Sequence, residues 1–269
     1  MTEASAAAPA PELLAGKYRL VRLIGEGGMG SVWEAMHEVT GKRLAIKRMS
    51  AQLLGHGEAV ERFVREARAA SAITHPNVVE IFDVGVHEGA PFMVMELLQG
   101  ESLADVLRRG VLDAISAVEV LTPVMLALAM AHERGIVHRD MKPDNIYLAR
   151  RGNRVVPKLL DFGISKSLGQ SQDHRLTRTG SVLGTPYYMA PEQAAGRRDI
   201  DHRVDVYALG AILYEALTGR VPFDADNYNA LLIAILTKDV TPVSAFRPDL
   251  PPAISDVVAR AMSRDVSLR

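Results

Sequence analysis

A short polar run near the middle of the chain brings together residue types that can do chemistry. It reads His138-Arg139-Asp140-Met141-Lys142-Pro143-Asp144-Asn145, and Asp161-Phe162-Gly163 follows it. Hard cations such as magnesium prefer oxygen ligands, which carboxylates and amides supply. A carboxylate can also accept the proton of a hydroxyl group. This inventory indicates a site that holds metal-bound phosphates and activates a hydroxyl.

The segments that flank these residues predict how they are positioned. Residues 135–137, 146–148 and 156–160 are largely apolar, and we expect a strand at each place. Such strands would lift the polar residues onto loops at one end of a sheet, where side chains from separate loops can converge on one ligand. We therefore interpret residues 138–145 as a catalytic loop.

The run resembles the protein-kinase catalytic loop, H-R-D-x-x-x-x-N, and the later triplet resembles the metal-binding D-F-G of kinases. The resemblance implies that Asp140 accepts the proton of the substrate hydroxyl, and that Asn145 and Asp161 hold the magnesium ions on the ATP phosphates. It also implies that Lys142 contacts the transferred phosphoryl group, as in kinases that act on serine or threonine. The alternative for this run is a charged turn without a catalytic role.

Residues 24–32 form a glycine-rich segment whose context decides its role. A G-x-G-x-x-G pattern alone also opens dinucleotide-binding folds, in which a helix follows the last glycine. Here residues 31–36 alternate as a strand does, so we expect two strands joined by a glycine turn that can approach phosphates closely. Resemblance to the kinase lid implies that the whole segment contacts the nucleotide, namely Ile24, Gly25, Glu26, Gly27, Gly28, Met29, Gly30, Ser31 and Val32.

The apolar strand expected at residues 44–47 ends in Lys47. A lysine on a buried strand is costly unless it has an anionic partner. Residues 58–70 are rich in helix formers, and Glu66 falls at the edge of their apolar stripe. Resemblance to the kinase V-A-I-K strand and its helix-borne glutamate implies that Lys47 pairs with Glu66. Glu58 and Glu61 are the alternatives in the same segment, and the spacing favours Glu66.

The sequence of residues 92–100 predicts a buried strand that is followed by a connector between two lobes. In kinases this hinge offers backbone hydrogen bonds to adenine, which the resemblance assigns to Glu96 and Leu98, with Met95 guarding the deeper pocket. The other adenine contacts that it implies are Ile24, Val32 and Ala45 on one face, Tyr147 on the opposite face, and Leu160. Many kinases carry Leu or Met where Tyr147 stands, so we expect a bulkier or shifted pocket floor.

Residues 184–192 resemble the end of a kinase activation segment, which forms the platform for a peptide. The resemblance implies that Thr185 has an ordering role beside Asp140 and Lys142. It also implies that Glu192 is buried and paired with Arg269. A platform of this kind favours a protein substrate over a metabolite.

The polar loop at residues 164–183 lacks apolar periodicity and suits regulation. Thr177 and Thr179 lie in it, and Arg139 offers a phosphate partner directly before Asp140. We hypothesise that both threonines are autophosphorylated and that the added charge pairs with Arg139. An unmodified, solvated loop is the alternative.

Length and composition agree with one bilobal domain. At 269 residues with 48% hydrophobic content, the chain can bury a full core. The resemblance implies an α+β protein-kinase-like fold, with a small antiparallel sheet and one helix in an N-lobe at residues 17–95, a hinge at 96–100, and a larger, mainly helical C-lobe at 101–269. We expect residues 1–16 to be a disordered Ala/Pro-rich tail, and the domain to be truncated before its last C-lobe helix.

Charge and composition exclude several other classes. A formal net charge of -1 and a pI of about 6.7 give no basic field for nucleic acid. The absence of cysteine excludes disulfides, zinc-cysteine sites and thiol chemistry. The first residues show neither a signal peptide nor a membrane span, which predicts a cytoplasmic domain, with any membrane anchor beyond residue 269.

The motifs occur in kinase order over residues 17–269 and predict a bacterial serine/threonine protein kinase of the eukaryotic (Hanks) type. The expected reaction transfers the γ-phosphoryl group of ATP, bound with Mg2+ or Mn2+, to hydroxyls of protein substrates, with homodimers for autophosphorylation in trans. A pseudokinase that binds ATP as a scaffold is one alternative, and such proteins usually lack one of Lys47, Asp140, Asn145 and Asp161. A small-molecule phosphotransferase is the other, and it would not need the peptide platform.

Overall fold

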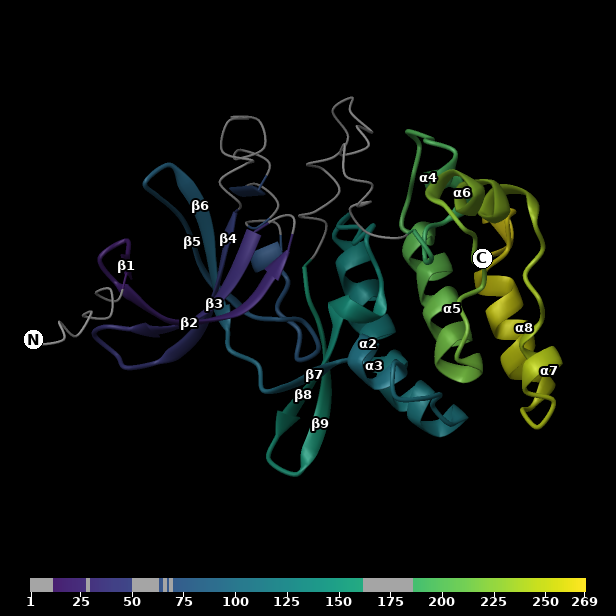
Figure 1. The fold of residues 1–269 in the computed structure, drawn as a ribbon, viewed down its shortest axis with the longest axis horizontal. Coiled ribbons are helices and arrows are strands. Elements are labelled where there is room, and N and C mark those ends of the chain that lie inside the picture. The colour runs from purple at the N-terminus through teal and green to yellow at the C-terminus, as the bar shows by residue number, and fades with distance from the viewer. Residues whose placement is uncertain (1–11, 28–29, 50–62, 65–66, 68–69, 162–185) are drawn as a thin grey trace, which may run out of the picture. The chain divides into compact units, whose positions relative to one another are not determined.

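The computed structural model describes residues 12–27, 30–49, 63–64, 67, 70–161 and 186–269. These residues form two compact units (Figure 1). Unit 1 lies within Met1–Arg68 and Glu80–Leu98, and unit 2 lies within Ala69–Val79 and Gln99–Arg269. An antiparallel sheet dominates unit 1, and helices dominate unit 2. The predicted α+β fold is confirmed.

Unit 1 is built on a six-stranded antiparallel sheet. Its strands are β1 (Leu13–Leu14), β2 (Tyr18–Gly27), β3 (Gly30–His37), β4 (Arg43–Met49), β5 (Ile81–His87) and β6 (Ala90–Glu96), in the order β1-β2-β3-β4-β6-β5. Alternation along β4 explains how the sheet buries one face. Leu44 and Ile46 join a buried apolar cluster, so Ala45 and Lys47 point to the opposite face.

Strand β1 corrects one expectation. The prediction that residues 1–16 form a disordered tail is wrong for its last part, because Leu13 and Leu14 pair with β2. Leu14 is 1% exposed and packs in the same apolar cluster as Tyr18 and Leu20. Burial of the Leu14 side chain, together with the strand pairing, holds this short segment on the sheet. Residues 1–11 lie outside the described part of the chain.

The helix expected at residues 58–70 is described only in part. Phe63, Val64, Ala67 and Ala70 are helical, and Phe63, Ala67 and Ala70 are buried. Their spacing of three and four residues is that of one helix face. Glu66 and its alternatives, Glu58 and Glu61, lie outside the described residues.

Unit 2 is mainly helical. Its helices are α2 (Leu103–Leu107), α3 (Ala114–Glu133), α4 (Pro191–Ala194), α5 (Arg203–Thr218), α6 (Tyr228–Thr237), α7 (Val243–Phe246) and α8 (Pro252–Ala261), with short 3-10 turns η2 (Pro143–Asn145) and η3 (Val266–Leu268). A three-stranded antiparallel sheet adds β7 (Gly100–Ser102), β8 (Ile146–Arg151) and β9 (Arg154–Leu159), in that order. The strands predicted at 146–148 and 156–160 are therefore confirmed as parts of β8 and β9.

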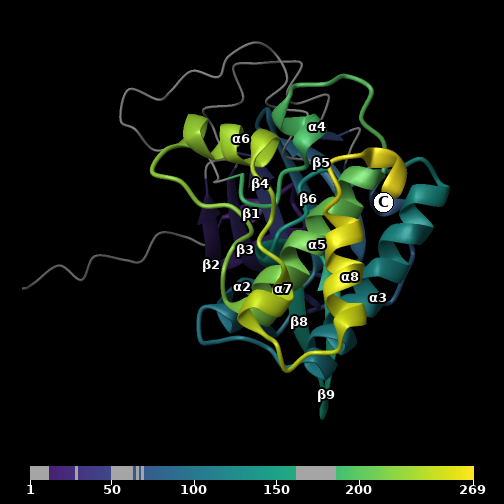
Figure 2. The same cartoon turned by 90° about the vertical axis from the view of Figure 1, so that its right-hand side faces the viewer.

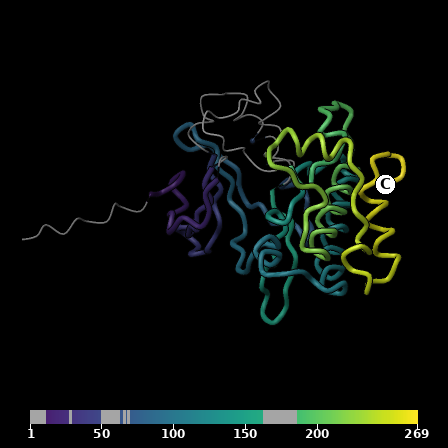
Figure 3. Tube along the Cα trace, turned by 45° about the vertical axis from the view of Figure 1, so that its right-hand side comes forward, coloured from purple at the N-terminus to yellow at the C-terminus, as the bar shows by residue number. Residues whose placement is uncertain are grey.

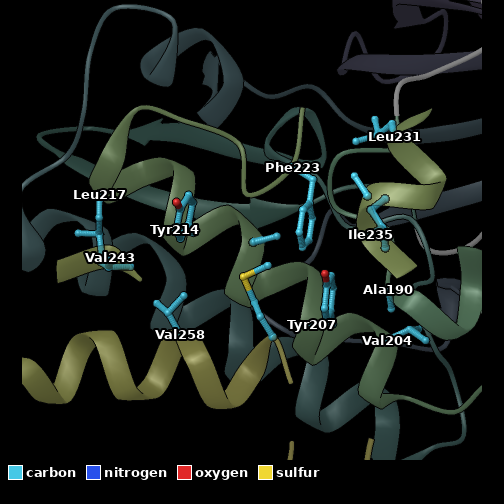
Figure 4. Packing of buried hydrophobic residues seen from close by; sticks show 14 residues of the cluster. Ala190, Val204, Tyr207, Tyr214, Leu217, Phe223, Leu231, Ile235, Val243 and Val258 are labelled. Atoms are coloured by element: carbon cyan, nitrogen blue, oxygen red, sulfur yellow. The ribbon is translucent and has the colours of Figure 1, made fainter. Parts of the chain in front are cut away.

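Helix α5 lies at the centre of unit 2, with α3 and α8 packed against it (Figure 2). Its Tyr207, Tyr214 and Leu217 share a buried apolar cluster with Val258 of α8 (Figure 4). Gly210 allows the close approach of α8, since a Cβ at this position would lie 2.8 Å from the Ala261 Cβ. This core supports the loops that follow α3 and precede α5.

Helix α3 leads into the catalytic loop. Asp113 is its N-cap residue, and the Asp113 carboxylate accepts hydrogen bonds from the Ile115 and Ser116 amides. Among the helices that the structure describes, it is the one long and apolar enough to span a membrane by length and composition alone. Its Leu121 and Leu128 are buried in unit 2.

The prediction of a strand at residues 135–137 is wrong. The chain turns at Gly135, with φ of 72°, and continues to Asp140 without regular structure. The amides of His138 and Arg139 donate to the Asp205 carboxylate rather than to a neighbouring strand. A side chain thus replaces the strand pairing that the apolar residues suggested.

Candidate catalytic site

A buried carboxylate on α5 holds the start of the catalytic loop. Asp205 is 1% exposed, and its Oδ2 accepts a hydrogen bond from the His138 amide at 2.8 Å. Its Oδ1 accepts one from the Arg139 amide, also at 2.8 Å, and His132 Nε2 donates to Oδ2 at 2.8 Å. Burial alone would raise the pKa of Asp205, but these hydrogen bonds outweigh it and lower the pKa. The carboxylate therefore remains ionised and fixes the backbone of the loop.

Arg139 takes a backbone conformation that few residues other than glycine adopt. Its φ is 64°, in the left-handed region. Besides the bond from its amide to Asp205, its carbonyl accepts a hydrogen bond from Gln193 Nε2 at 3.0 Å. Both polar groups of this strained peptide segment are thus held from outside, while the Arg139 side chain is exposed.

His138 links the catalytic loop to the segment before Asp161. The imidazole is completely buried, and its Nδ1 accepts the Asp140 amide at 3.3 Å. The other ring nitrogen, Nε2, therefore carries a hydrogen and donates it to the Leu160 carbonyl at 2.8 Å. This assignment of donor and acceptor follows from the hydrogen-bond network and gives His138 a structural role.

Asp140 is held between two neighbours of the same loop. Asn145 Nδ2 donates to the Asp140 carbonyl at 2.7 Å and lies 3.4 Å from Oδ2 of its carboxylate. Lys142 Nζ lies 3.6 Å from the same Oδ2. The structure thus brings together three of the residues expected to be catalytic, with the Asp140 carboxylate at the centre.

Asp161 joins this group through the backbone. The Leu160 amide donates to the Asn145 carbonyl at 2.9 Å, so Asp161 directly follows a peptide tied to the catalytic loop. Asp161 has a φ of 49°, which makes it a second non-glycine residue in the left-handed region at this site. Strained backbone of this kind concentrates where side chains must be aimed for function.

The donor set fits a hard divalent cation. Asn145 is 7% exposed and uses its amide nitrogen toward Asp140, which leaves the amide oxygen as the atom that a metal ion could use. Among the described residues, no group of three or more His, Cys, Asp or Glu side chains could hold a metal ion. Magnesium suits a site with few protein oxygens, since it commonly keeps waters and substrate phosphates as its other ligands.

Unit 1 arranges the expected nucleotide residues by strand register. Lys47 lies opposite Val32 on one side and Met93 on the other, while Ala45 lies opposite Met95. These side chains share the face of the sheet that lies opposite the apolar cluster. Gly27 and Gly30 pair where β2 leads into β3, as predicted for a flap of two strands.

The hinge residues lie at the end of β6. The Glu96 amide donates to the Glu80 carbonyl at 2.9 Å, and the Glu96 carboxylate accepts the Glu80 amide at 3.0 Å. The Glu96 side chain is thus directed back into unit 1, and Leu98 follows it as a half-buried residue. In unit 2, Tyr147 is half-buried on β8, and burial raises the pKa of its hydroxyl, with the Asp105 charge adding to the effect.

Comparison with known proteins decides the family. Residues 18–269 match the protein kinase domain, which is nearly the whole chain. The chain belongs to the protein kinase family. Kinase domains use ATP and a divalent metal ion, so the family agrees with the oxygen donors of Asn145 and Asp161.

Several curated relatives of this kinase domain are bacterial proteins. It is 44% identical to serine/threonine-protein kinase Pkn1 of Myxococcus xanthus over 93% of the chain, and 42% identical to pkn3 of the same organism over 94%. It is 35% identical to PrkC of Bacillus subtilis over 94% of the chain. The chain spans only 36%, 47% and 38% of the lengths of these three relatives.

Solved structures show the same fold. The PknI kinase domain of Mycobacterium tuberculosis is similar with a TM-score of 0.75 at 29% identity, over 98% of this chain and 94% of that chain. A second crystal structure of the same kinase domain gives a TM-score of 0.75 at 30% identity, with 98% and 93% covered. The bilobal kinase fold implied by the motifs is therefore confirmed.

A buried ion pair ties Arg269 to Glu192 of α4. Arg269 Nη1 and Nη2 donate to the two carboxylate oxygens of Glu192 at 2.5 and 2.9 Å. The Arg269 side chain is 0% exposed, and its Nε donates to the Ser263 carbonyl at 2.7 Å. The structure thus brings together two residues 77 positions apart that the family resemblance had paired.

Sequence reasoning missed the residues that hold the loop. Asp205, His132 and Gln193 make the contacts described above, yet the motifs assigned none of them a role. The available signal was a lone aspartate in the first turn of the apolar helix α5, a place where an unpartnered charge would be costly.

Several predicted residues lie in the parts of the chain that the structure does not describe. They are Gly28, Met29, Glu66, Thr177, Thr179 and Thr185, together with Phe162 and Gly163 of the D-F-G triplet. Their assigned roles stay predictions.

Proposed function

We propose that this domain is an active serine/threonine protein kinase. The observation that carries the proposal is the setting of Asp140. Lys142 Nζ lies 3.6 Å from Oδ2 of its carboxylate, and Asn145 Nδ2 donates to its main-chain carbonyl at 2.7 Å. A general base needs a fixed direction, and the anchored backbone of this loop supports one for Asp140. The names of the curated relatives support the choice of serine and threonine as acceptors.

The reaction assigns a distinct task to each side chain. Asp140 accepts the proton as the hydroxyl oxygen of a substrate serine or threonine bonds to the γ-phosphorus of ATP. The bond from that phosphorus to the β,γ-bridging oxygen breaks, and ADP leaves. Lys142 and Lys47 offset negative charge on the phosphate oxygens. The resemblance assigns contact with the nucleotide to residues 24–32, Ala45, Met95, Glu96, Leu98, Tyr147 and Leu160.

Asn145 and Asp161 would hold the divalent ion, and we propose Mg2+ as the natural one. When bound, such an ion neutralises charge on the phosphates and orients them for transfer. Both donors are oxygens, which suits magnesium, although manganese accepts the same ligands. Phosphorylation rates compared at matched free Mg2+ and Mn2+ test the choice, and a rate that is appreciable only with Mn2+ would contradict it.

Substitution of the base is the direct test of activity. Asp140→Asn keeps the shape of the side chain but cannot accept the proton, so phosphorylation of a generic basic protein should fall about 100-fold or more. Asp256→Asn is a matched control, because Asp256 is exposed on α8 and no bond to its side chain is described. Undiminished activity of Asp140→Asn would show that the base is assigned wrongly.

A second substitution separates catalysis from nucleotide binding. Lys47→Met removes the cation that we assign to ATP positioning and should cost most of the phosphotransfer rate. Titration with ATP and Mg2+ should show that the wild-type domain both binds and turns over the nucleotide. Binding without any phosphotransfer would favour the pseudokinase scaffold instead.

We also propose autophosphorylation of Thr177 and Thr179, with Arg139 as the phosphate partner. The exposed Arg139 side chain, on a backbone held by Asp205 and Gln193, supports the choice of receiver. Mass spectrometry after incubation with Mg-ATP should find phosphate on these threonines. If two copies act on each other, the rate per molecule should rise with protein concentration, and a rate independent of concentration would exclude the trans reaction.

A further inference from the structure

Gln193 uses both ends of its side-chain amide. It is the third residue of α4, and its Oε1 accepts a hydrogen bond from the Ala190 amide at 3.1 Å. Its Nε2 donates to the Arg139 carbonyl at 3.0 Å, across 54 positions of the sequence. One side chain thus links the end of the segment predicted to form the peptide platform, residues 184–192, to the catalytic loop.

The α4 end of this link is anchored in the core of unit 2. Ala190 is 0% exposed and lies in the buried apolar cluster with Tyr207 of α5 and Ile235 of α6 (Figure 4). Helix α4 itself contacts α6 (Figure 3). The Gln193 amide also donates to the Ala190 carbonyl at 3.0 Å. The backbone from which the Gln193 side chain starts is therefore held in place.

The other end of the link holds the peptide bond that joins Arg139 to Asp140. The oxygen of this peptide accepts the bond from Gln193, and its N–H, which belongs to Asp140, donates to His138 Nδ1 at 3.3 Å. A peptide group is planar, so bonds to its oxygen and its nitrogen together set the orientation of the whole plane. The N–Cα bond of Asp140 lies in that plane. Gln193 therefore helps to set the direction in which the Asp140 side chain leaves the backbone.

Asp205 does not make this bond redundant. The Arg139 amide, which Asp205 binds at 2.8 Å, belongs to the peptide between His138 and Arg139. The two torsion angles of Arg139 lie between that peptide and the next one, and its φ of 64° is a costly value for a residue with a side chain. Loss of the Gln193 bond would free the second peptide to turn while the first stays bound.

The link needs an amide side chain rather than a carboxylate. Glutamate and glutamine at the third position of a helix can both accept the hydrogen bond of the N-cap amide. A glutamate carboxylate has no hydrogen to donate, so it would place its lone pairs against those of the Arg139 carbonyl. Capping of α4 therefore accounts for one end of Gln193, and the bond to Arg139 requires the other.

We propose that Gln193 is a positioning residue for Asp140, which connects the peptide platform to the peptide bond that aims the base. A substrate hydroxyl presented on the platform and the carboxylate that takes its proton then share one support. Small errors in the alignment of reacting groups lower a rate strongly. Gln193 acts through the backbone of Arg139 and Asp140 and does not itself contact the reacting atoms. The proposal rests on the proposed phosphotransfer function and deepens it.

Two substitutions separate the link from capping. Gln193→Glu keeps the acceptor for the Ala190 amide but loses the donor to Arg139, whereas Gln193→Met loses both. With a generic basic protein as substrate, both variants should lower kcat about tenfold and leave KM for ATP within about twofold of wild type. Gln193→Met should also lower Tm more than Gln193→Glu does, because it loses the cap. A fall in kcat confined to Gln193→Met would show that Gln193 only caps α4, and would overturn the proposal.

The control adds the same charge to α4 without touching the link. Ala195 is exposed at the end of this helix, and Ala195→Glu should keep kcat within about twofold of wild type. An equal fall in Ala195→Glu and Gln193→Glu would mean that the added charge, rather than the lost donor, slows the reaction. That result would also overturn the proposal.

Amide hydrogen exchange, followed by NMR without nucleotide, tests the link independently of activity. In both Gln193 variants the Asp140 amide should exchange about tenfold faster than in wild type. The Arg139 amide, still bound by Asp205, should stay within about twofold. Unchanged exchange at Asp140 would overturn the proposal. A wild-type protein that transfers no phosphate would instead contradict the proposed function, and the exchange rates would still decide whether Gln193 holds the loop.

Discussion

Two buried carboxylates, one in each unit, are satisfied in opposite ways. Asp205 in unit 2 and Glu34 in unit 1 are each 1% exposed. Asp205 binds backbone amides of the catalytic loop and one histidine. The side-chain partners of Glu34 in the described part of the chain are arginines. The partners, rather than the burial, decide what each carboxylate does for the protein.

The arginines around Glu34 remain largely in water. Arg22 and Arg43 are 64% and 60% exposed, and each contacts one oxygen of the carboxylate. The hydrogen bond from Arg43 is the largest cause of the lowered pKa of Glu34, and burial opposes it. Arg22 Nη2 lies 2.8 Å from Oε2, although Oε2 has no well-aligned hydrogen bond among the described residues. Solvent screening at the guanidinium groups keeps such pairs weak.

The contrast shows that the kind of partner decides whether a buried carboxylate fixes the backbone. A carboxylate bound to backbone amides fixes the path of the chain, because an amide cannot move without moving its residue. A carboxylate bound to long side chains does not constrain the backbone in this way. When the carboxylate is removed, these long side chains can reach water instead. The following experiments remove the charge of each carboxylate, or one of its partners, in turn.

The largest effect is expected for Asp205→Asn. An amide side chain can accept a backbone hydrogen bond at its oxygen, but its nitrogen would face an amide donor in a buried place. We expect a loss of about 3 kcal/mol in the free energy of unfolding, which is the range for breaking a buried polar network. Phosphotransfer should fall about 100-fold, because Arg139 and Asp140 lose their positions. Chemical denaturation and a phosphorylation assay measure the two losses.

Asp201→Asn is the matched control for that variant. Asp201 lies two residues before α5 and pairs with Arg203 at 2.8 Å. Its side chain is 44% exposed. Its pKa is lowered to about 2, mainly by hydrogen bonds from Arg203. Because the pair is exposed, its loss should cost well under 1 kcal/mol. Equal damage from the two variants would contradict the special role of Asp205.

Much of the site could be predicted, because chemistry restricts which residue types can do it. Asp140, Asn145 and Asp161 can be grouped from their short spacings, since the base and the two oxygen ligands that we propose must lie on neighbouring loops. Their local structure follows from the apolar strands β8 and β9 beside them.

The support of the site could not be predicted in the same way. Asp205 acts on amides 67 and 66 residues before it, and a backbone amide leaves no trace in the sequence. The apolar residues 135–137 suggested a strand because local pattern ignores a side chain that arrives from α5. Short β1 was missed for a related reason, since Leu14 finds its partners only in the folded sheet.

Acid should remove the contribution of Asp205 in a defined direction. The pKa of Asp205 in the folded protein is lowered from an ordinary value of 3.8, so the stabilisation is complete above that pH and is lost as pH falls through the folded-state pKa. The stability gap between wild type and Asp205→Asn should therefore shrink at pH below about 4. Denaturation midpoints of both proteins across this range measure the gap. A gap that stays constant would mean that Asp205 is not ionised in the folded protein.

An intermediate effect is expected for His132→Phe. This change removes the donor to Asp205 Oδ2 but leaves the two backbone amides in place. We expect a loss of about 1.5 kcal/mol in stability and a fall in phosphotransfer of less than about tenfold. His132→Gln, whose amide can donate to the same oxygen, should recover part of both. Failure of glutamine to recover anything would show that ring packing, rather than the hydrogen bond, explains the role of His132.

The smallest effect is expected for Glu34→Gln. The side chain keeps its volume and one acceptor oxygen, and the released guanidinium groups of Arg22 and Arg43 are already in contact with water. The free energy of unfolding should fall by less than about 1 kcal/mol, and phosphotransfer should stay within about twofold of wild type. High salt should narrow the stability difference further, because it screens exposed charges. A loss as large as that of Asp205→Asn would show that burial of the carboxylate, and not the kind of partner it binds, sets the energetic scale in both units.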